Sequence, residues 1–250
     1  MIWTVLLVAA LLGAWQLYVA VSGVSDIVLP APLDVARALA ENPGLLWDNF
    51  RTTAVEVAGG ITVALVVGLV LAVALHLSAR ARRALYPLLV ASQAVPVPVL
   101  APLLVVWLGF TVGPKLVIIG LVCFFPVVVT TLDALRRTDP DQLKLLRTLD
   151  ASRWQVLRWV ELPAALPAAL SGAKVAVAVA VIGAVLAEDA GAESGLGLMI
   201  TQANAQFDIA LSFAACVVLA AFALVLFFTL QTAERRIAPW AHPAERGTST

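Results

Sequence analysis

Charged side chains are scarce in this chain of 250 residues. Asp, Glu, Lys and Arg together make up 13% of it, whereas 62% of the residues are hydrophobic. A soluble domain carries about 25% charged and about 45–50% apolar residues, so this composition cannot supply a water-facing surface. The sequence predicts an all-α polytopic membrane protein, because its apolar runs are continuous and lack the short alternating segments of a β-barrel.

Residue types that bind metals or form disulfides are also few. The two cysteines, Cys123 and Cys216, lie inside apolar runs and are expected to be small core residues rather than a disulfide or a metal site. Of the two histidines, His76 stands at the end of an apolar run and His242 in the polar tail. We therefore expect neither a metal site nor a cofactor.

Motifs of catalysis and nucleotide binding are missing. The sequence contains no HExxH, CxxC or Gly-x-Ser-x-Gly pattern, so no catalytic residue is expected. It also lacks the GxxxxGK loop, followed by Ser or Thr, that holds nucleotide phosphates, so the chain is not expected to bind ATP in that way. No basic patch is interleaved with aromatic side chains, which argues against nucleic acid as a partner.

Six apolar runs are long enough to cross a bilayer, which takes about 20 residues of helix. A cleaved signal peptide is the alternative for the first run, but no Lys or Arg precedes it, and its Trp and Tyr residues suit a membrane interface. Residues 26–53 are mixed and contain Pro30 and Pro32, so a surface helix outside the bilayer is expected there. Within one transmembrane domain, 1–250, the expected spans are 2–22, 54–78, 84–109, 115–132, 165–187 and 209–231.

Lys and Arg side chains are distributed unevenly between the two sides of these spans. With the N-terminus inside, twelve fall inside and three outside, which predicts that both termini are cytoplasmic. Lys174 lies in the inner half of the fifth span, where we expect it to extend toward the cytosol; pairing with an acidic residue is the alternative. The twelve are Arg80, Arg82, Arg83, Arg136, Arg137, Lys144, Arg147, Arg153, Arg158, Arg235, Arg236 and Arg246, and the three are Arg37, Arg51 and Lys115.

Prolines interrupt the third span. Proline removes a backbone donor and kinks a helix, and in lipid such breaks are tolerated where protein or a water-lined cavity satisfies the backbone. Either ordinary kinked packing or a wall of a transport path explains them. We take Pro96 and Pro98 as candidate path residues, together with Gln202 and Asn204 in the polar segment before the last span. Packing or a solvated loop is the alternative for each.

A charged segment, residues 133–164, separates the fourth and fifth spans. Asp139 and Pro140 predict a helix start, with Asp139 as the N-cap. Asp150 is expected to cap a second short helix that Leu162 and Pro163 end, turning the chain back to the membrane. Exposed Trp, Leu and Arg side chains on two such helices suit an interface with a soluble partner. A loop that packs only on its own helix ends is the alternative.

This segment resembles the cytoplasmic loop of permease subunits of bacterial binding-protein-dependent ATP-binding-cassette (ABC) importers. The family pattern is Glu-Ala-Ala, three residues, Gly, nine residues, Ile, one residue and Leu-Pro. It falls here on 144–146, Asp150, Val160 and 162–163, so the Leu-Pro end and the spacing match, whereas the opening triplet and the Gly do not. Asp tolerates left-handed backbone geometry better than most residues, so the bend is expected to survive at Asp150.

Several further segments are similar to permeases for nitrate, sulfonate, taurine and thiamine-precursor uptake. They are residues 29–39, the Pro-rich run 93–115 and the segment 180–197, which holds Glu188 and a Gly-Leu-Gly sequence. Residues 202–215 are similar to permeases for hydroxymethylpyrimidine-type thiamine precursors and riboflavin. The resemblance covers most of residues 28–240 and implies a small solute, with a heteroaromatic vitamin precursor first and a sulfonate, taurine or nitrate as the alternative.

The resemblance also implies an assembly in the bacterial cytoplasmic membrane. Two permease copies, expected to be a homodimer, work with two cytoplasmic ATPase subunits and an extracytoplasmic binding protein by alternating access. ATPase activity then belongs to the partner, so this chain is not expected to be an enzyme. The residues expected to dock the ATPase are Ala151, Ser152, Trp154, Leu157, Arg158, Leu162 and Pro163.

Two other classes of function compete with the importer. A stand-alone secondary carrier predicts an inverted repeat of Pro-broken segments, and the sequence shows one such break without a mate. A membrane scaffold without transport predicts that the Pro-rich and small-residue spans tolerate bulky substitutions.

Overall fold

The computed structural model describes residues 2–241, so His242 and Arg246 lie outside the described part. Its regular elements are all helices, which confirms the predicted all-α membrane fold. They are α1 (Ile2–Ser22), α2 (Pro32–Glu41), α3 (Pro43–Leu77), α4 (Ala79–Ser92), α5 (Val97–Leu108), α6 (Val112–Arg136), α7 (Pro140–Thr148), α8 (Arg153–Val156), η1 (Leu157–Glu161), α9 (Leu162–Gly191), α10 (Leu196–Ala205), α11 (Ile209–Ile237) and η2 (Pro239–Ala241).

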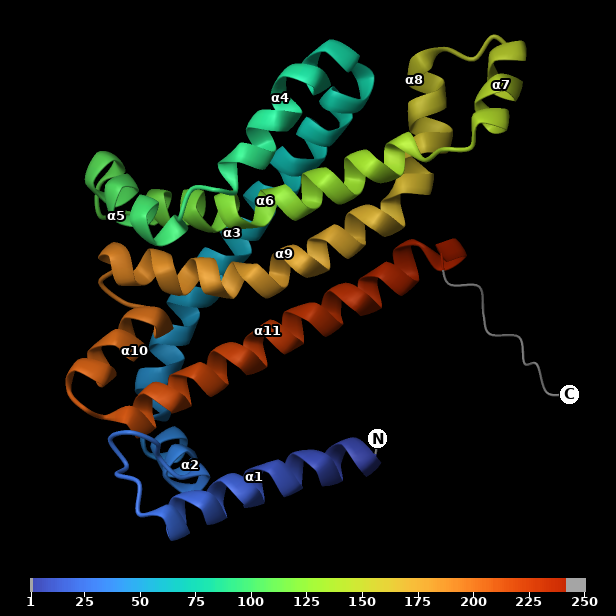
Figure 1. Cartoon of the computed structure of the whole chain (residues 1–250). Coiled ribbons are helices and arrows are strands. Elements are labelled where there is room, and N and C mark those ends of the chain that lie inside the picture. Colours follow the sequence, from blue (N-terminus) through green and yellow to red (C-terminus); the bar gives the residue numbers. More distant parts are fainter. Residues whose placement is uncertain (1, 242–250) are drawn as a thin grey trace, which may run out of the picture.

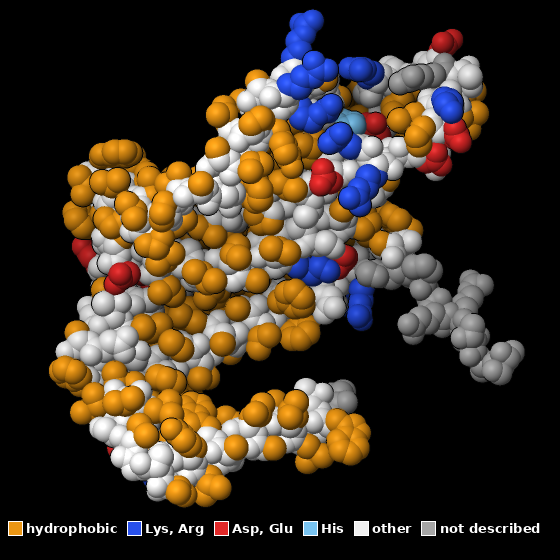
Figure 2. Space-filling model, viewed as in Figure 1, with side chains coloured by type: hydrophobic (Ala, Val, Ile, Leu, Met, Phe, Trp, Pro, Cys, Tyr) orange, Lys and Arg blue, Asp and Glu red, His pale blue; other side chains and the backbone are white. Residues whose placement is uncertain are grey.

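Most helices run between two ends of the molecule (Figure 1). We call the end that carries α7 and α8 the loop end, and the end that carries α2 and α10 the α10 end. Five helices in the described residues are long and apolar enough to cross a membrane, and the bent pair α4–α5 makes up to six. The start of α1 and the end of α11 lie on the same side as α7 and α8. Figure 2 shows Lys and Arg gathered at the loop end, with apolar side chains over the flanks.

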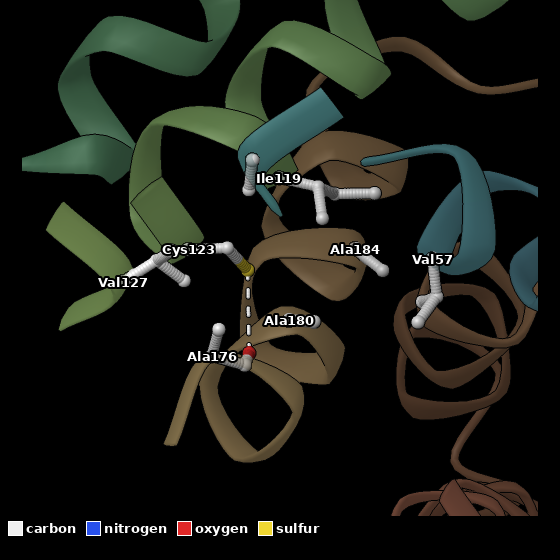
Figure 3. Close-up of a cluster of buried hydrophobic side chains, with 8 residues drawn as sticks. Val57, Ile119, Cys123, Val127, Ala176, Ala180 and Ala184 are labelled. Atoms are coloured by element: carbon white, nitrogen blue, oxygen red, sulfur yellow. Dashed lines mark hydrogen bonds between the residues drawn. The ribbon is translucent and has the colours of Figure 1, made fainter. Parts of the chain in front are cut away.

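The core is built from α3, α6 and α9, which pack against one another. Figure 3 shows one buried cluster in which small residues of α9, such as Ala176 and Ala180, meet Ile119 and Cys123 of α6. The Cys123 thiol donates to the Ala176 carbonyl, with 3.3 Å between sulfur and oxygen. Close approach between helices is the expected use of small residues in membranes. Cys123 is thus a core residue as predicted, but Cys216 is exposed on α11, where the core prediction is wrong.

The third predicted span is not one straight helix. The structure breaks it into α4 and α5, whose axes differ by 100° across a short connection. Pro96 has extended backbone angles (φ −68°, ψ 114°) and precedes the first residue of α5. Val95 lies outside both helices, in keeping with the rule that helical geometry is disfavoured for the residue before a proline. Pro98 lies in the first turn of α5, where proline is tolerated. The paired prolines therefore end one helix and start another.

Two other boundaries differ from expectation. The helix of the second span begins at Pro43 rather than near residue 54. Pro163 does not end the loop helix, because α8, η1 and α9 form one continuous helix from residue 153 to 191. The π-helical turn η1 comes just before Pro163, which lies in the first turn of α9. A π turn replaces the regular i→i+4 hydrogen bonds of an α-helix by wider i→i+5 bonds. The missing amide hydrogen and the bulky ring of Pro163 are therefore accommodated without a break in the helix.

Lys174 does not extend freely toward the cytosol. Its ammonium nitrogen lies 2.5 Å from Oε2 of Glu234 near the end of α11, so the paired alternative is the correct one. Glu234 is buried. A buried charge in a membrane protein needs a partner, and this pair joins the loop-end half of α9 to α11.

Candidate functional site

The charged segment forms a bent pair of short helices at the loop end. Asp139 caps α7 as predicted, since its carboxylate accepts from the Asp141 amide at 2.9 Å. After α7, Asp150 has φ +52°, and the Ala151 amide donates to the Leu146 carbonyl at 3.1 Å. This is the hydrogen bond of a Schellman motif, with Asp150 in the left-handed position that usually holds Gly. The bend predicted at Asp150 is confirmed. We call residues 140–156 the elbow.

The second helix of the elbow is capped by Ser152 rather than by Asp150. The Gln155 amide donates to Ser152 Oγ at 3.3 Å, and the Ser152 amide donates to Gln155 Oε1 at 2.7 Å. These two bonds form a reciprocal capping box. The prediction that Asp150 caps this helix is wrong, because its left-handed backbone is occupied in ending α7. Ser152 and Gln155 were the signal in the sequence, a Ser followed three residues later by Gln.

The predicted docking residues fall into two groups. Ser152, Trp154 and Arg158 are exposed, Trp154 to 60%, and Ala151 is half-buried beside them. Leu157 is completely buried, so its predicted direct contact with a partner is not possible in this conformation. The elbow and η1 also expose three large apolar side chains that sequence reasoning did not single out for docking, namely Leu145, Leu149 and Trp159.

The elbow is tied to the helical core at its base. Leu157 packs with Leu135 of α6 and Ala165 of α9. Nε2 of His76, at the end of α3, lies 2.8 Å from Oε2 of Glu161. The buried Leu157 therefore anchors the elbow instead of contacting a partner. Leu162 and Pro163 are half-buried and, with Arg158, line a separate hollow on the flank of α9.

A buried polar network lies at the α10 end around Glu188, a residue to which the sequence analysis assigned no role. The carboxylate of Glu188, fully buried near the end of α9, accepts from the Thr53 hydroxyl at 2.6 Å and from the Gly197 amide at 2.5 Å. The Thr53 hydroxyl in turn accepts from the Leu196 amide at 2.9 Å. The Gly195 amide donates to Asn49 Oδ1 at 2.8 Å. These bonds fasten the start of α10 to α3 and α9.

The glycine before α10 is required by this geometry. Gly195 has φ +138°, a backbone conformation that side chains rarely adopt, and a Cβ there would overlap the carboxylate of Glu188. The Gly-Leu-Gly sequence was visible beforehand, but its partner stands seven residues earlier on another helix. We call the set of Asn49, Thr53, Glu188 and residues 195–197 the α10 latch.

A second buried pair adjoins the α10 latch. Nζ of Lys115, at the start of α6, lies 2.6 Å from Oε1 of Glu56, and both side chains are buried. Glu56 is on the same helix as Thr53, one turn further along. Lys115 was expected as an outside charge flanking a span, and its distant partner on α3 could not be seen in the sequence.

The candidate path residues lie on two helices at the α10 end. Pro96 and Pro98 are at the start of α5, and Gln202 and Asn204 are on α10; all four are exposed. Both helices contact α9 near its end, and they lie on opposite sides of it (Figure 1). The α10 latch thus holds the helix that carries Gln202 and Asn204.

Comparison with known proteins agrees with this architecture. Residues 64–240 match the family described as binding-protein-dependent transport system inner membrane component. The fold is similar to a chain of the MetNI methionine ABC transporter solved in inward facing conformations, with a TM-score of 0.66, 19% identity and coverage of 84% of this chain and 98% of that one.

Three curated relatives cover nearly the whole chain. A probable ABC transporter permease of Haemophilus influenzae is 38% identical, over 90% of this chain and 92% of the relative. The riboflavin transport system permease RibX of Chloroflexus aurantiacus is 36% identical over 92% and 87%. The formylaminopyrimidine transport permease ThiX of Halalkalibacterium halodurans is 32% identical over 92% of both. These matches agree with the architecture of up to six membrane-spanning helices and with the bent loop. The chain belongs to the family of binding-protein-dependent inner membrane components and is the multi-pass permease subunit of an ABC importer.

Proposed function

We propose that this permease imports a heteroaromatic vitamin precursor, of the hydroxymethylpyrimidine or riboflavin type, delivered by an extracytoplasmic binding protein. The similarity to permeases named for riboflavin and formylaminopyrimidine transport supports this substrate class. Gln202 and Asn204 on α10 offer amide donors and acceptors that suit the ring nitrogens and oxygens of such solutes. Together with Pro96 and Pro98 they are our candidates for the path.

The proposed assembly is a homodimer with two cytoplasmic ATPase subunits docked on the elbows. The loop end and both chain termini are then cytoplasmic, in keeping with the Lys and Arg side chains gathered there (Figure 2). ATP hydrolysis is assigned to the partner, and closure of the ATPase pair draws the two elbows together. This movement shifts the permeases between two arrangements.

The observation that carries the docking proposal is the exposed apolar surface of the elbow. Trp154, Leu145 and Leu149 present large apolar side chains to solvent on a segment too polar to enter lipid. Trp is a frequent anchor of protein interfaces. The Asp150 turn and the Ser152 capping box fix the angle between α7 and α8, so the docking surface is preformed. Ala151 and Ser152 lie at the vertex of this angle.

Docking is tested by co-purification of the ATPase with variants Ala151→Glu and Trp154→Glu of the co-expressed complex. Each places a carboxylate in the proposed interface, and we expect loss of most of the bound ATPase. Gln142→Glu, a charge change at an exposed site of α7 away from the vertex, is the matched control. Retention of the ATPase by both test variants would remove the docking proposal.

The substrate class is tested by uptake into proteoliposomes that contain the complete importer, with ATP inside and binding protein outside. We expect ATP-dependent uptake of radiolabelled hydroxymethylpyrimidine or riboflavin and none of taurine. Uptake of taurine or nitrate alone would move the permease to the alternative class. Uptake that follows an ion gradient without ATPase subunits would favour a stand-alone carrier.

A further inference from the structure

A hollow of about 390 Å³ opens on the flank of the molecule near the loop end. Most of its walls come from α3, α9 and the π-helical turn η1 before α9. One further residue comes from α6, and η2 adds Trp240. All the lining residues are apolar except two. The lining consists of Leu69, Val73, Thr131, Arg158, Leu162, Pro163, Ala165, Leu166, Ala169 and Trp240. We call it the flank pocket.

The first polar residue of the flank pocket, Thr131, is buried with an unsatisfied hydroxyl. Its side chain is 2% exposed, and Oγ1 has no hydrogen-bond partner among residues 2–241. The adjacent Thr130 differs, because its hydroxyl donates to the Pro126 carbonyl one turn earlier at 2.8 Å. A buried hydroxyl without a partner is costly. An acceptor brought in by a ligand would satisfy it.

The second polar residue, Arg158, is a cation without an anionic partner. Its guanidinium carbon lies 5.6 Å from the centre of the Trp159 ring, and no carboxylate of the described chain forms an ion pair with it. Arg158 belongs to η1, at the loop-end edge of the pocket, where Trp240 also stands exposed. An arginine beside exposed tryptophans is the composition expected at the headgroup level of a membrane.

The pocket changes from polar to apolar with depth. At 1.5 Å of rise per residue, Thr131 lies about 8 Å below the end of α6 and Leu69 about 12 Å below the end of α3. Arg158 therefore marks the surface, Thr131 an intermediate level and Leu69 with Ala169 the deepest level. A membrane phospholipid has the same order of groups, with phosphate outermost, ester carbonyls next and acyl chains deepest.

We propose that the flank pocket binds one anionic phospholipid of the leaflet at the loop end. The phosphate pairs with Arg158, an ester carbonyl accepts from the Thr131 hydroxyl, and one acyl chain lies against Leu69, Val73 and Ala169. Basic pockets between membrane helices are suited to anionic headgroups. Because η1 connects the pocket to the elbow, the lipid would brace the helix that carries the proposed ATPase-docking surface.

Lipid binding can be measured on the purified full chain by native mass spectrometry after delipidation. The probes are dioleoylphosphatidylglycerol and dioleoylphosphatidylcholine, which share acyl chains and differ in headgroup charge. We expect one tightly bound phosphatidylglycerol and at least ten-fold weaker binding of phosphatidylcholine. Equal binding of the two lipids would overturn the proposal. No ATPase is present, so the result is independent of the docking and substrate proposals.

Two variants address the polar contacts, each with a matched control. Thr131→Val keeps the shape and removes the hydroxyl, so it should weaken the binding of phosphatidylglycerol about five-fold. Thr130→Val, on the neighbouring face, should leave this binding unchanged. Arg158→Gln should abolish the preference for the anionic lipid, whereas Arg153→Gln, one turn earlier and outside the pocket, should retain it. Effects of the same size in the controls would show nonspecific charge or folding effects and would contradict the site.

A third variant guards against misfolding. Ala169→Leu fills the deep part of the flank pocket and should displace the lipid while the thermal melting midpoint stays within a few degrees. Thr131→Ser keeps a hydroxyl and should restore most of the affinity lost in Thr131→Val. If Ala169→Leu binds phosphatidylglycerol as well as the unaltered chain does, the lipid is elsewhere and the proposal fails.

Discussion

The two ends of this permease differ in which side chains they bury and which they leave exposed. At the α10 end, Glu188, Thr53 and the amides of the α10 latch satisfy one another in complete burial. At the loop end, the elbow holds its shape through local caps and leaves Trp154 and Leu149 exposed. The polar groups of the α10 latch are all used in internal contacts, whereas the exposed apolar side chains of the elbow are free to contact another molecule. The buried network therefore suits a fixed joint, and the elbow suits a surface that meets a partner.

The comparison predicts that stability is concentrated at the α10 end. Glu188→Ala leaves the Gly197 amide buried without an acceptor, which costs about 1–3 kcal/mol, and leaves the Thr53 hydroxyl only its 3.2 Å bond to the Asn49 carbonyl. The cavity left by the shorter side chain adds to this cost. We expect a loss of about 4 kcal/mol in the free energy of unfolding, measured by denaturation in detergent. Asp189→Ala, at the exposed adjacent residue, should cost less than about 1 kcal/mol. Equal losses of stability in the two variants would show that the buried hydrogen bonds of Glu188 stabilise the fold no more than the exposed carboxylate of Asp189 does.

Lys115→Met should have the next largest effect. It leaves Glu56 as a buried carboxylate without its partner, which costs about 3 kcal/mol for a pair of this kind. The double variant with Glu56→Gln removes both charges and should recover most of the loss. A double variant as unstable as the single one would mean that the pair acts through packing rather than through charge.

Loss of the Ser152 cap should lower stability less than the two preceding changes, and only near the elbow. Ser152→Ala removes the acceptor for the Gln155 amide and should cost about 1 kcal/mol. Hydrogen exchange of the amides in residues 152–156 is the direct measurement, because the elbow can open without unfolding the core. Ser152→Asp keeps an acceptor and should preserve the protection. Faster exchange at the α10 latch as well would contradict a local role.

Trp154→Ala should have the smallest effect on stability and still weaken assembly. Its side chain is exposed and contributes little to the isolated fold, so we expect a change within about 0.5 kcal/mol. The same variant should weaken ATPase binding by at least ten-fold, as measured by titration of the purified subunits. A large stability loss without any change in binding would place Trp154 in the fold rather than in the interface.

Local features of the elbow were predictable because their causes lie within a few residues. The start of α7 at Asp139 and Pro140 and the bend at Asp150 follow from backbone preferences that the sequence states directly. The cap of α8 was misassigned because Asp150 and Ser152 are both N-cap residue types. An N-cap residue has an extended backbone, as Ser152 has (φ −66°, ψ 156°), whereas Asp150 is left-handed. The continuous helix through Pro163 was missed because the π turn that accommodates it has no comparable local signal.

Contacts between distant residues were not predictable in the same way. Lys174 has no acidic residue within one helical turn in the sequence, and its pairing with Glu234 depends on how α9 lies against α11. Leu157 belongs to an apolar pattern that suits either an exposed interface or a core, and the packing of α6 against α9 made it core. The candidate path residues were named by type, and how α5 and α10 lie relative to each other depends on the packing of both helices against α9.

Composition and the length of the apolar runs by themselves determined that this is a helical membrane protein. The spacing of Asp150 and the Leu-Pro pair determined the family resemblance that the comparisons confirm. Only the tertiary structure decided that Glu188 holds α10 and that Thr131 lines a pocket with its hydroxyl unpaired, while the Thr130 hydroxyl bonds its own helix. The physical reason is that secondary structure depends on neighbouring residues, whereas the partner of a buried polar group depends on which helices pack together.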